Sequence, residues 1–326
     1  MIKVGILGAG NIAGVMADTL RRMDNVICCA VAARDGSRAE AFAKTYGFAE
    51  SYGSYEEMLA SSEAELIYVA TPHSCHYDHV KLCLQYGKHV LCEKAFMLNA
   101  KQAEEVFAMA KEKRLLLTEA IWTRYMPSRR MLQDVLEGGA IGKPQMLTAN
   151  LGYVTKHKER IQKLELGGGA LLDVGIYPLN FASMVFGDDV KEIRGWAVFN
   201  EEGADMQNSV TLTYADGRMA VLNSTALARS DRGGVIYGDE GYIVVSNINN
   251  CSGFRVYSTS DELLASYESP EQISGYEYEV EACIQAIRQG ELECPQMPHE
   301  ETLRMMRWMD ELRRQWGMKF PQEDAR

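Results

Sequence analysis

The chain is long enough for two hydrophobic cores, and its charge excludes one class of partner. It has 326 residues, 47% of them hydrophobic, and this length favours two domains over one. Its 34 lysines and arginines and 45 aspartates and glutamates give a net charge of −11, with no basic run that could neutralise a phosphate backbone. The composition therefore argues against nucleic acid as a partner.

The N-terminus and the apolar segments indicate a cytoplasmic protein. The chain begins on the strand-like segment Ile2–Leu7, without the charged region and the small-residue cleavage site of a signal peptide. We expect no apolar stretch to be long enough to span a bilayer. We therefore expect a cytoplasmic location and no membrane partner.

Cysteine and histidine patterns give only a weak indication of a bound metal. The eight cysteines have no zinc-type spacing, and several, such as Cys28 and Cys29, lie in apolar runs. His73, His76 and His79 repeat at intervals of three, which is the one pattern that could supply ligands. We expect reduced core thiols and no metal.

Residues 1–120 alternate short apolar runs with amphipathic segments, the pattern of a doubly wound α/β domain. Strands joined through helices lie parallel, and a strand without alternation, such as Leu66–Ala70, is buried on both faces. We therefore predict a parallel Rossmann sheet. In chain order, the expected strands and helices are Val4–Leu7, Ile12–Met23, Val26–Ala32, Ser37–Tyr46, Leu66–Ala70, His76–Tyr86 and His89–Cys92.

The turn after the first strand has the form of a dinucleotide-binding loop. Gly8, Gly10 and Ala13 make a G-x-G-x-x-A motif where the first strand passes into the first helix. Gly8 permits a tight turn, Gly10 lets the backbone approach a pyrophosphate, and Ala13 allows close helix packing. The helix N-terminus at Asn11 and Ile12 adds amide donors and a favourable dipole. The motif predicts a nicotinamide dinucleotide cofactor.

The end of the second strand bears on the ribose of that cofactor. Arg34 offers a planar fork for a 2′-phosphate, with Arg38 one turn further along. In the alternative interpretation both arginines are solvated charges at a helix start and Asp35 is an N-cap. The residues favour NADP, with NAD as the alternative.

From Ile121 onward the strand-like segments are longer and are separated mostly by polar turns. This pattern predicts an α+β domain over residues 121–326, built on a large, mostly antiparallel open sheet. The expected strands are Gln145–Gly152, Glu192–Phe199, Ser209–Tyr214 and Arg218–Thr225, and the expected helices are Ala170–Phe186, Tyr278–Arg288 and His299–Trp316.

Together with the glycine motif, three further segments resemble the Gfo/Idh/MocA (glucose–fructose oxidoreductase) family. These segments are Ala70–His76, Gly87–Ala95 and Gly169–Tyr177. Glu119–Tyr125 is similar to the branch that contains dimeric dihydrodiol dehydrogenase and NADP-dependent D-xylose 1-dehydrogenase, and the likeness extends to Lys319–Gln322. The resemblance covers nearly the whole chain and implies a dinucleotide-binding domain followed by a domain for substrate binding and dimerisation.

The resemblance also implies roles for single residues. The family's Glu-Lys-Pro motif falls on Glu93, Lys94 and Ala95, and its lysine lies beside the nicotinamide and the substrate. Ala95 replaces the usual proline, which leaves the loop conformation open. The implied cofactor-binding residues are Gly8, Gly10, Asn11, Ile12, Ala13, Arg34, Arg38, Thr71, Pro72, His76, Glu93 and Lys94.

Asp173 and Tyr177 match the family's aspartate and its catalytic acid/base, and a tyrosine there is typical of the dihydrodiol dehydrogenase branch. Four residues apart, they share a face if the helix has begun, and Pro178 indicates a helix start near Gly175. The alternative makes Asp173 an N-cap and Tyr177 a core residue. The predicted substrate-binding residues are Trp122, Arg124, Tyr125, Tyr153, Asp173 and Tyr177.

These residues predict an oxidoreductase that transfers a hydride between NADP(H) and a CH–OH or C=O group of a small sugar, polyol or cyclic diol. Hydride leaves a carbon only as its hydroxyl loses a proton, which requires a base and a cation near the oxygen. We assign Tyr177 as the base, Lys94 as the cation and Asp173 as the residue that orients the substrate. His76 is the next candidate for the base.

Two other functions are open. A non-catalytic NADP-binding sensor or scaffold would keep the glycine motif but would not need Lys94 and Tyr177. A sugar-phosphate dehydrogenase would need a clustered set of lysines and arginines, and we find no such set in the second domain that can be assigned to the cleft. For the assembly we expect a homodimer, because a sheet covered by helices on one face leaves the other face to be buried or unusually polar.

Overall fold

The computed structural model describes residues 1–324, which group into two compact units. The first unit comprises residues 1–125 and 272–303, and the second comprises residues 126–271 and the segment from Arg304 onward. The boundary predicted at residue 120 differs from this division, because it places residues 272–303 in the second domain.

Residues 272–303 belong to the first unit because they bind its first helix and the turn before its second strand. Helix α9 (Glu277–Gln289) carries Glu281, whose carboxylate accepts hydrogen bonds of 2.9 and 3.0 Å from Nδ2 of Asn25. The hydroxyls of Thr19 and Ser274 lie 2.7 Å apart. These contacts join segments that are more than 250 residues apart in the chain and that no local pattern connects.

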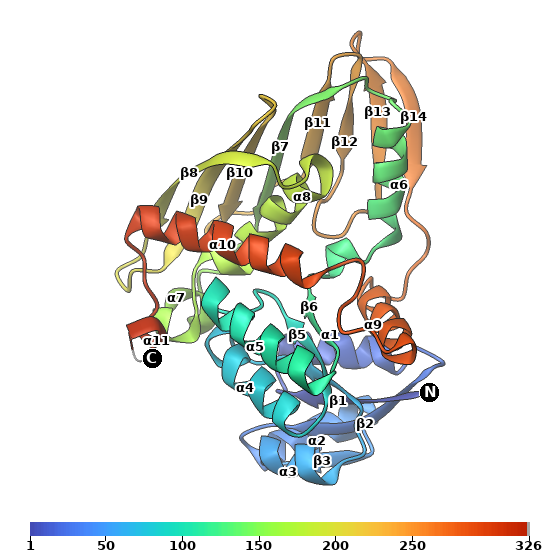
Figure 1. The fold of residues 1–326 in the computed structure, drawn as a ribbon, viewed down its shortest axis with the longest axis vertical. Helices are drawn as coiled ribbons and strands as arrows, with labels where there is room; N and C mark the ends of the chain where they lie inside the picture. The colour runs from blue at the N-terminus through green and yellow to red at the C-terminus, as the bar shows by residue number, and fades with distance from the viewer. Residues whose placement is uncertain (325–326) are drawn as a thin grey trace. The chain divides into compact units, whose positions relative to one another are not determined.

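The first unit contains a six-stranded parallel sheet with the order β3-β2-β1-β4-β5-β6 (Figure 1), which confirms the predicted doubly wound fold. The strands are β1 (Ile2–Leu7), β2 (Val26–Ala32), β3 (Glu50–Tyr52), β4 (Leu66–Val69), β5 (His89–Glu93) and β6 (Leu117–Ala120). The helices besides α9 are α1 (Asn11–Leu20), α2 (Gly36–Tyr46), α3 (Tyr55–Ser61), α4 (His73–Gln85), α5 (Ala100–Lys113) and the 3₁₀-helix η1 (Trp122–Arg124).

Burial explains which strands were predictable. All four residues of β4 are buried, so this strand reads as a continuous apolar run, as parallel strands covered on both faces do. Strand β3 has only three residues, none of them fully buried, and it pairs with β2 at the edge of the sheet. A strand this short shows no period, so the sequence analysis does not predict it.

The second unit contains an eight-stranded sheet with the order β14-β13-β12-β11-β7-β10-β9-β8 (Figure 1). Its pairs are antiparallel except β7 with β10, which is parallel, so the predicted mostly antiparallel sheet is confirmed. The strands are β7 (Pro144–Gly152), β8 (Val190–Phe199), β9 (Asp205–Tyr214), β10 (Met219–Thr225), β11 (Gly234–Gly238), β12 (Gly241–Val245), β13 (Gly253–Ser258) and β14 (Leu263–Glu268).

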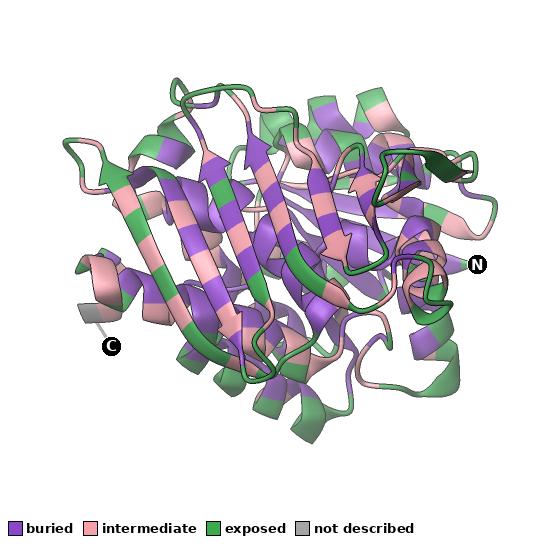
Figure 2. Cartoon of the chain, turned by 90° about the horizontal axis from the view of Figure 1, so that it is seen from above, coloured by how far each residue is buried: buried purple, intermediate pink, exposed green. Residues whose placement is uncertain are grey.

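One face of this sheet carries the core of the second unit. Along β9, the side chains of Val210, Leu212 and Tyr214 are buried, while the residues between them are partly exposed, as the alternating colours in Figure 2 show. Helix α8 (Ile176–Phe186) packs on β7 and β10. Helix α10 (His299–Trp316), which begins in the first unit, binds β8 through the hydrogen bond from Nε1 of Trp316 to the carbonyl oxygen of Gly195 (2.9 Å).

One segment corrects a prediction made from composition. Leu164–Phe186 is long and apolar enough to cross a membrane, contrary to our expectation that no stretch would be, but 89% of its most apolar window is buried. It is the core segment of the second unit, so burial inside the protein accounts for its apolar character. The remaining helices of this unit are α6 (Pro127–Glu137), α7 (Glu159–Gln162), the 3₁₀-helix η2 (Leu164–Leu166), the π-helix η3 (Leu171–Gly175) and α11 (Pro321–Asp324).

Candidate active site

The glycine loop between β1 and α1 has the shape of a cradle for an anion. Gly8 has a φ of +103°, and a β-carbon there would lie 2.7 Å from the carbonyl oxygen of Ala70, so only glycine fits. A β-carbon on Gly10 would meet no atom within 4 Å. Gly10 is the N-cap of α1 and makes no side-chain cap, so the first amides of the helix are left for a ligand. These features fit a pyrophosphate.

The residues predicted to read the ribose lie beside this loop. Asp35 caps α2 by accepting a 2.9 Å hydrogen bond from the amide of Ser37, as the alternative interpretation had it. The guanidinium of Arg38 donates to the carbonyl oxygen of Ala9 (3.1 Å), which places Arg38 against the glycine loop. Arg34 is exposed at the end of β2. Arg38 is therefore at the edge of the cradle, while the place of Arg34 in the ribose site stays a prediction.

The three histidines of α4 make hydrogen bonds within the first unit. Nδ1 of His79 lies 2.9 Å from the hydroxyl of Thr71, and Nε2 of His73 lies 3.2 Å from the carbonyl oxygen of Lys94. His76 is fully buried, with Nε2 2.8 Å from the carbonyl oxygen of Thr71. Within residues 1–324 there is no group of three histidine, cysteine or acidic side chains that could hold a metal ion. All eight cysteines are free thiols.

The loop after β5, which carries Lys94, is held by hydrogen bonds to its backbone. The amide of Lys94 donates to the carboxylate of Glu93 (3.2 Å), which also accepts from the hydroxyl of Tyr68. The amide of Phe96 donates to the buried carboxylate of Glu119 (3.1 Å). The Lys94–Ala95 peptide bond is cis. The loop conformation that the replacement of proline left open is thus well defined by its surroundings.

His76 supports the same loop and is unsuited to acid–base chemistry. Its Nδ1 lies 3.0 Å from the carbonyl oxygen of Ala95 and 3.2 Å from that of Phe96. Burial lowers the pKa of His76 to about 4, although its hydrogen bonds to three carbonyl oxygens favour the protonated ring. His76 is therefore a neutral, buried support of the loop and not a base open to substrate.

Two of the predicted substrate-binding residues make their polar contacts inside the first unit. Arg124 is buried and forms an ion pair with Glu301, and the hydroxyl of Tyr125 donates to the carbonyl oxygen of Glu119 (2.8 Å). These contacts favour a structural role for Arg124 and Tyr125. Trp122 is also buried and stacks on a neighbouring aromatic ring. Its place in the substrate site stays a prediction.

Asp173 and Tyr177 lie on a continuous helical segment of the second unit. Asp173 is in the π-helix η3, and Tyr177 is the second residue of α8, which begins at Ile176, close to the predicted start. Asp173 is helical and not an N-cap, so that half of the alternative is wrong, whereas Tyr177 is buried, as the other half expected. Its carboxylate accepts a 2.8 Å hydrogen bond from the guanidinium of Arg160, while Tyr177 is 6% exposed. A π-helix is common at functional sites because it changes which side chains share a face.

The start of η3 is anchored by the buried carboxylate of Asp205. This carboxylate accepts hydrogen bonds from the amide of Leu171 (2.8 Å) and from Nδ2 of Asn208 (2.9 Å), and burial raises its pKa to about 7. Gly169 has a φ of +119°, and a β-carbon there would lie 2.2 Å from Oδ1 of Asp205. Asp205 thereby sets where the helix with Asp173 begins.

Sequence analysis missed three charged residues of the second unit that bear on the site. Arg160 and Asp205 are described above, and Arg232 donates a 3.4 Å hydrogen bond to the hydroxyl of Tyr153. Arg160 belongs to a basic stretch that could have been noticed. For Asp205 and Arg232 the sequence carries no local signal, because their partners come from other strands and loops.

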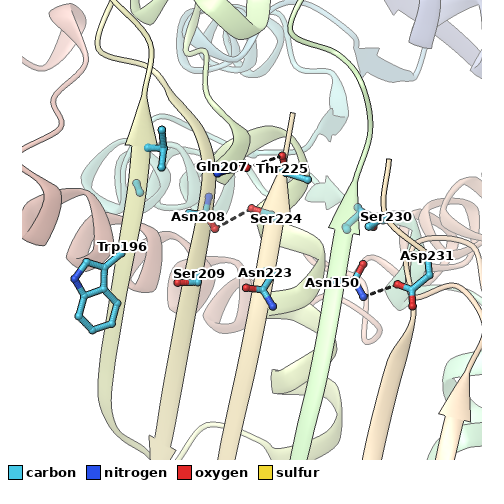
Figure 3. Close-up of a pocket in the computed structure, with 13 residues that line it drawn as sticks. Asn150, Trp196, Gln207, Asn208, Ser209, Asn223, Ser224, Thr225, Ser230 and Asp231 are labelled. Carbon is cyan, nitrogen blue, oxygen red and sulfur yellow. Dashed lines mark hydrogen bonds between the residues drawn. The ribbon is translucent and has the colours of Figure 1, made fainter. Parts of the chain in front are cut away.

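A hollow of about 570 Å³ lies on the open face of the second unit's sheet (Figure 3), and none of the predicted site residues lines it. Small polar side chains line it, and Trp196 stands at its edge with 72% of its surface exposed. In Figure 3, Asn150 and Asp231 are joined by a hydrogen bond of 2.6 Å at the opposite side. This hollow offers amide and hydroxyl groups but no arrangement for hydride transfer.

The two-unit fold and the glycine cradle define a nicotinamide-dependent oxidoreductase. Residues 2–120 match the family model for oxidoreductases with an NAD-binding Rossmann fold, and residues 130–244 match the GFO/IDH/MocA C-terminal domain. Trans-1,2-dihydrobenzene-1,2-diol dehydrogenase from Xenopus tropicalis is 34% identical over 98% of this chain and 99% of the relative, and the human enzyme of that name is 32% identical over 99% of each. The chain belongs to the Gfo/Idh/MocA family.

Solved structures agree with this assignment. KijD10, a 3-ketoreductase from Actinomadura kijaniata in complex with NADP and TDP-benzene, matches with a TM-score of 0.87 and 26% identity over 96% of this chain and 97% of that one. An aldose–aldose oxidoreductase from Caulobacter crescentus shares the fold, with a TM-score of 0.86 and 19% identity over 96% of each chain. The predicted family, fold class and oxidoreductase activity are confirmed.

The first prediction concerns His76 and pH. An unfolded histidine has a pKa of about 6.5, so the unfolded state takes up this proton first as the pH falls and the folded state does so only near pH 4. The free energy of unfolding should therefore drop between about pH 6.5 and pH 4, by up to about 3 kcal/mol from this residue. Urea unfolding of the wild type and of His76→Gln across this range measures the difference. His157→Gln, which changes an exposed histidine, should keep the wild-type slope, and an unchanged slope in His76→Gln would contradict the assignment.

Proposed function

We propose that this oxidoreductase transfers a hydride between NADP(H) and a CH–OH or C=O carbon of a small sugar, polyol or cyclic diol. The observation that carries the proposal is the loop of Lys94, whose backbone is held from several sides by Glu93, His73, His76 and Glu119. Such support positions a catalytic group and is not needed for a scaffold. The names of the relatives, a dihydrodiol dehydrogenase and a 3-ketoreductase, support the substrate class.

The first unit would bind the dinucleotide, and the second would bind the substrate. The glycine cradle and the free amides of α1 suit the pyrophosphate, and Thr71, Pro72 and Lys94 would line the rest of the cofactor site. When bound, the nicotinamide accepts or gives the hydride. Every other group needed for the reaction comes from side chains of this chain.

Three side chains divide the remaining work. Tyr177 takes the proton from the substrate hydroxyl in oxidation and returns it in reduction. Lys94 stabilises the negative charge that develops on the same oxygen. Its charge also makes Tyr177 a better base, because an ordinary tyrosine, with a pKa near 10, is a poor base at neutral pH without a cation nearby. Asp173, held by Arg160 at 2.8 Å, orients a second hydroxyl of the substrate. Tyr177 and Lys94 belong to different units, so their pairing rests on the motifs that place them.

For the assembly and location, we propose a cytoplasmic homodimer formed through the open face of the second unit's sheet. Trp196 and Val198 expose 72% and 52% of their surface there, beside rows of small polar residues. A face of this composition suits a second copy of itself, since hydroxyl and amide groups can pair across a twofold axis.

The catalytic assignment predicts distinct phenotypes for three variants. Tyr177→Phe should lower kcat about 10²–10⁴-fold, the usual contribution of general acid–base catalysis, and should leave NADP binding intact. Lys94→Met should also lower kcat and flatten the acidic limb of the pH–rate profile. Asp173→Asn should act mainly on the KM of the substrate. Steady-state kinetics on a substrate found by screening sugars, polyols and trans-dihydrodiols measures all three, and near-normal turnover of Tyr177→Phe would refute the assignment of the base.

The cofactor assignment predicts a lower KM for NADP than for NAD. Charge-assisted contacts of Arg34 and Arg38 with a 2′-phosphate contribute about 1.5–3 kcal/mol, and Arg34→Ala should remove most of the preference. Parallel measurements with both cofactors give the ratio, with Arg21→Ala, another exposed arginine of the first unit, as control. A wild type that prefers NAD, or a variant that discriminates as before, would exclude this ribose site.

The proposed assembly predicts a dimer at micromolar concentration. Light scattering should give twice the mass of one chain, and Trp196→Glu should shift the mass toward the monomer because it adds a charge to an apolar contact. Tyr86→Glu, which changes an exposed aromatic residue of the first unit, is the matched control. A monomeric wild type would rule out this interface.

A further inference from the structure

Arg232 is a half-buried cation for which the structure provides no anionic partner. It lies in the loop between β10 and β11 of the second unit. Its Nε is buried without a hydrogen-bond partner, and its guanidinium makes one hydrogen bond, through Nη1 to the hydroxyl of Tyr153 (3.4 Å). No carboxylate among residues 1–324 pairs with it. A cation removed from water without a counter-charge is unfavourable, so the position is suited to an anion supplied from outside.

The backbone holds Arg232 in place. Its φ is +63°, a left-handed backbone conformation that residues other than glycine rarely adopt. Its amide donates to Oδ1 of Asn150 (3.2 Å) and to the hydroxyl of Ser230 (3.1 Å), and its carbonyl oxygen accepts from the amide of Ile248 (2.9 Å). These hydrogen bonds impose the conformation. Residues kept in this region by their surroundings are frequent at ligand sites.

The neighbouring carboxylate does not neutralise Arg232. Asp231 accepts hydrogen bonds from Nδ2 of Asn150 (2.6 Å) and from the amide of Gly233 (3.2 Å), and Figure 3 shows it on the open face of the sheet. On Arg232 itself, the guanidinium carbon lies 5.6 Å from the centre of the Tyr153 ring, within the range of a cation–π contact. The hydroxyl of Tyr153 is fixed in turn by a 3.0 Å hydrogen bond to Oδ1 of Asn249.

This arrangement is at the end of the sheet where the proposed substrate residues of the second unit begin. Tyr153 follows β7, and its amide donates to the carbonyl oxygen of Thr225 at the end of β10 (3.1 Å). The π-helix of Asp173 packs on the same end. Its Gly175 lies so close to β10 that a β-carbon there would be 3.0 Å from the hydroxyl of Ser224. Arg160, the partner of Asp173, is the second residue of α7, which follows the loop that Tyr153 opens.

The two loops at this end are basic in a chain that is acidic overall. The amides of Thr155 and Lys156 both donate to the carbonyl oxygen of Ala226 (2.9 and 3.1 Å), which ties the loop after β7, taken here to the start of α7 (residues 153–160), to the loop 226–233. Together the loops contain five lysines and arginines and two acidic residues, against a net charge of −11 for the whole chain. The local positive potential attracts anions to the position of Arg232.

We propose that Arg232, seated on Tyr153, forms a subsite for an anionic group of the substrate, a carboxylate or a phosphate. The planar fork of a guanidinium matches both groups in bidentate geometry. This inference rests on the proposed function and deepens it: the preferred substrate is a sugar acid or a sugar phosphate rather than a neutral sugar or diol.

Matched substrates and a matched variant test the subsite. We expect a lower KM for D-glucuronate or D-glucose 6-phosphate than for D-glucose. Arg232→Gln should raise the ratio of charged to neutral KM about tenfold or more, the size of a lost charge-assisted pair. Arg229→Gln, the same change at an exposed arginine three residues earlier, should shift it less than about threefold. An unchanged ratio in Arg232→Gln, or equal shifts in both variants, would overturn the proposal.

A binding measurement separates this inference from the catalytic one. Calorimetric titration with D-gluconate or D-glucose 6-phosphate should show binding to the wild type and to Tyr177→Phe, and weakened binding to Arg232→Gln. Arg232→Lys, which keeps the charge but loses the fork, should bind with intermediate affinity, provided that thermal unfolding shows all variants folded. A wild type that binds neither probe would overturn the subsite, whereas full turnover of Tyr177→Phe would overturn the catalytic assignment and leave the subsite standing.

Discussion

The first unit depends on the requirement that buried backbone groups find hydrogen-bond partners. The loop after β5 runs below the surface, so side chains from separate elements must satisfy its amides and carbonyl oxygens. His76 from α4 and Glu119 from β6 do so, and burial shifts the protonation equilibrium of both: it lowers the pKa of His76 to about 4 and raises that of Glu119 to about 7. The position of Lys94 follows from these buried contacts and not from a preference of its own segment.

The second unit solves the same problem at the start of η3. The carboxylate of Asp205 accepts a hydrogen bond from the amide of Leu171, and Gly169 leaves room for it because a side chain there would overlap the carboxylate. A buried acid and a glycine at positive φ thus determine where the helix of Asp173 begins. In both units, a polar group taken out of water fixes the backbone that carries a proposed site residue.

Much of the fold was predictable because it follows from periodicity. The parallel strands of the first unit, the helix over His299–Trp316 and the glycine turn all leave local patterns. What escaped prediction depends on contacts between distant segments. The return of residues 272–303 to the first unit, the burial of Arg124 against Glu301, and the anchoring role of Asp205 are set by partners that local sequence does not reveal. The sequence does not distinguish Arg232 from an ordinary surface charge, because its surroundings depend on contacts between two loops that are distant in the chain.

The division of the chain has a consequence for its synthesis. Chain segments pass between the units at three places, after residues 125, 271 and 303. When the ribosome has made residues 1–125, the first unit still lacks α9 and its contacts with Asn25, which emerge only after all eight strands of the second unit. The second sheet therefore has the opportunity to form while the first unit is incomplete. No single cut of the chain yields two whole units, and a fragment ending at residue 125 is a nucleotide-binding sheet without its closing helix.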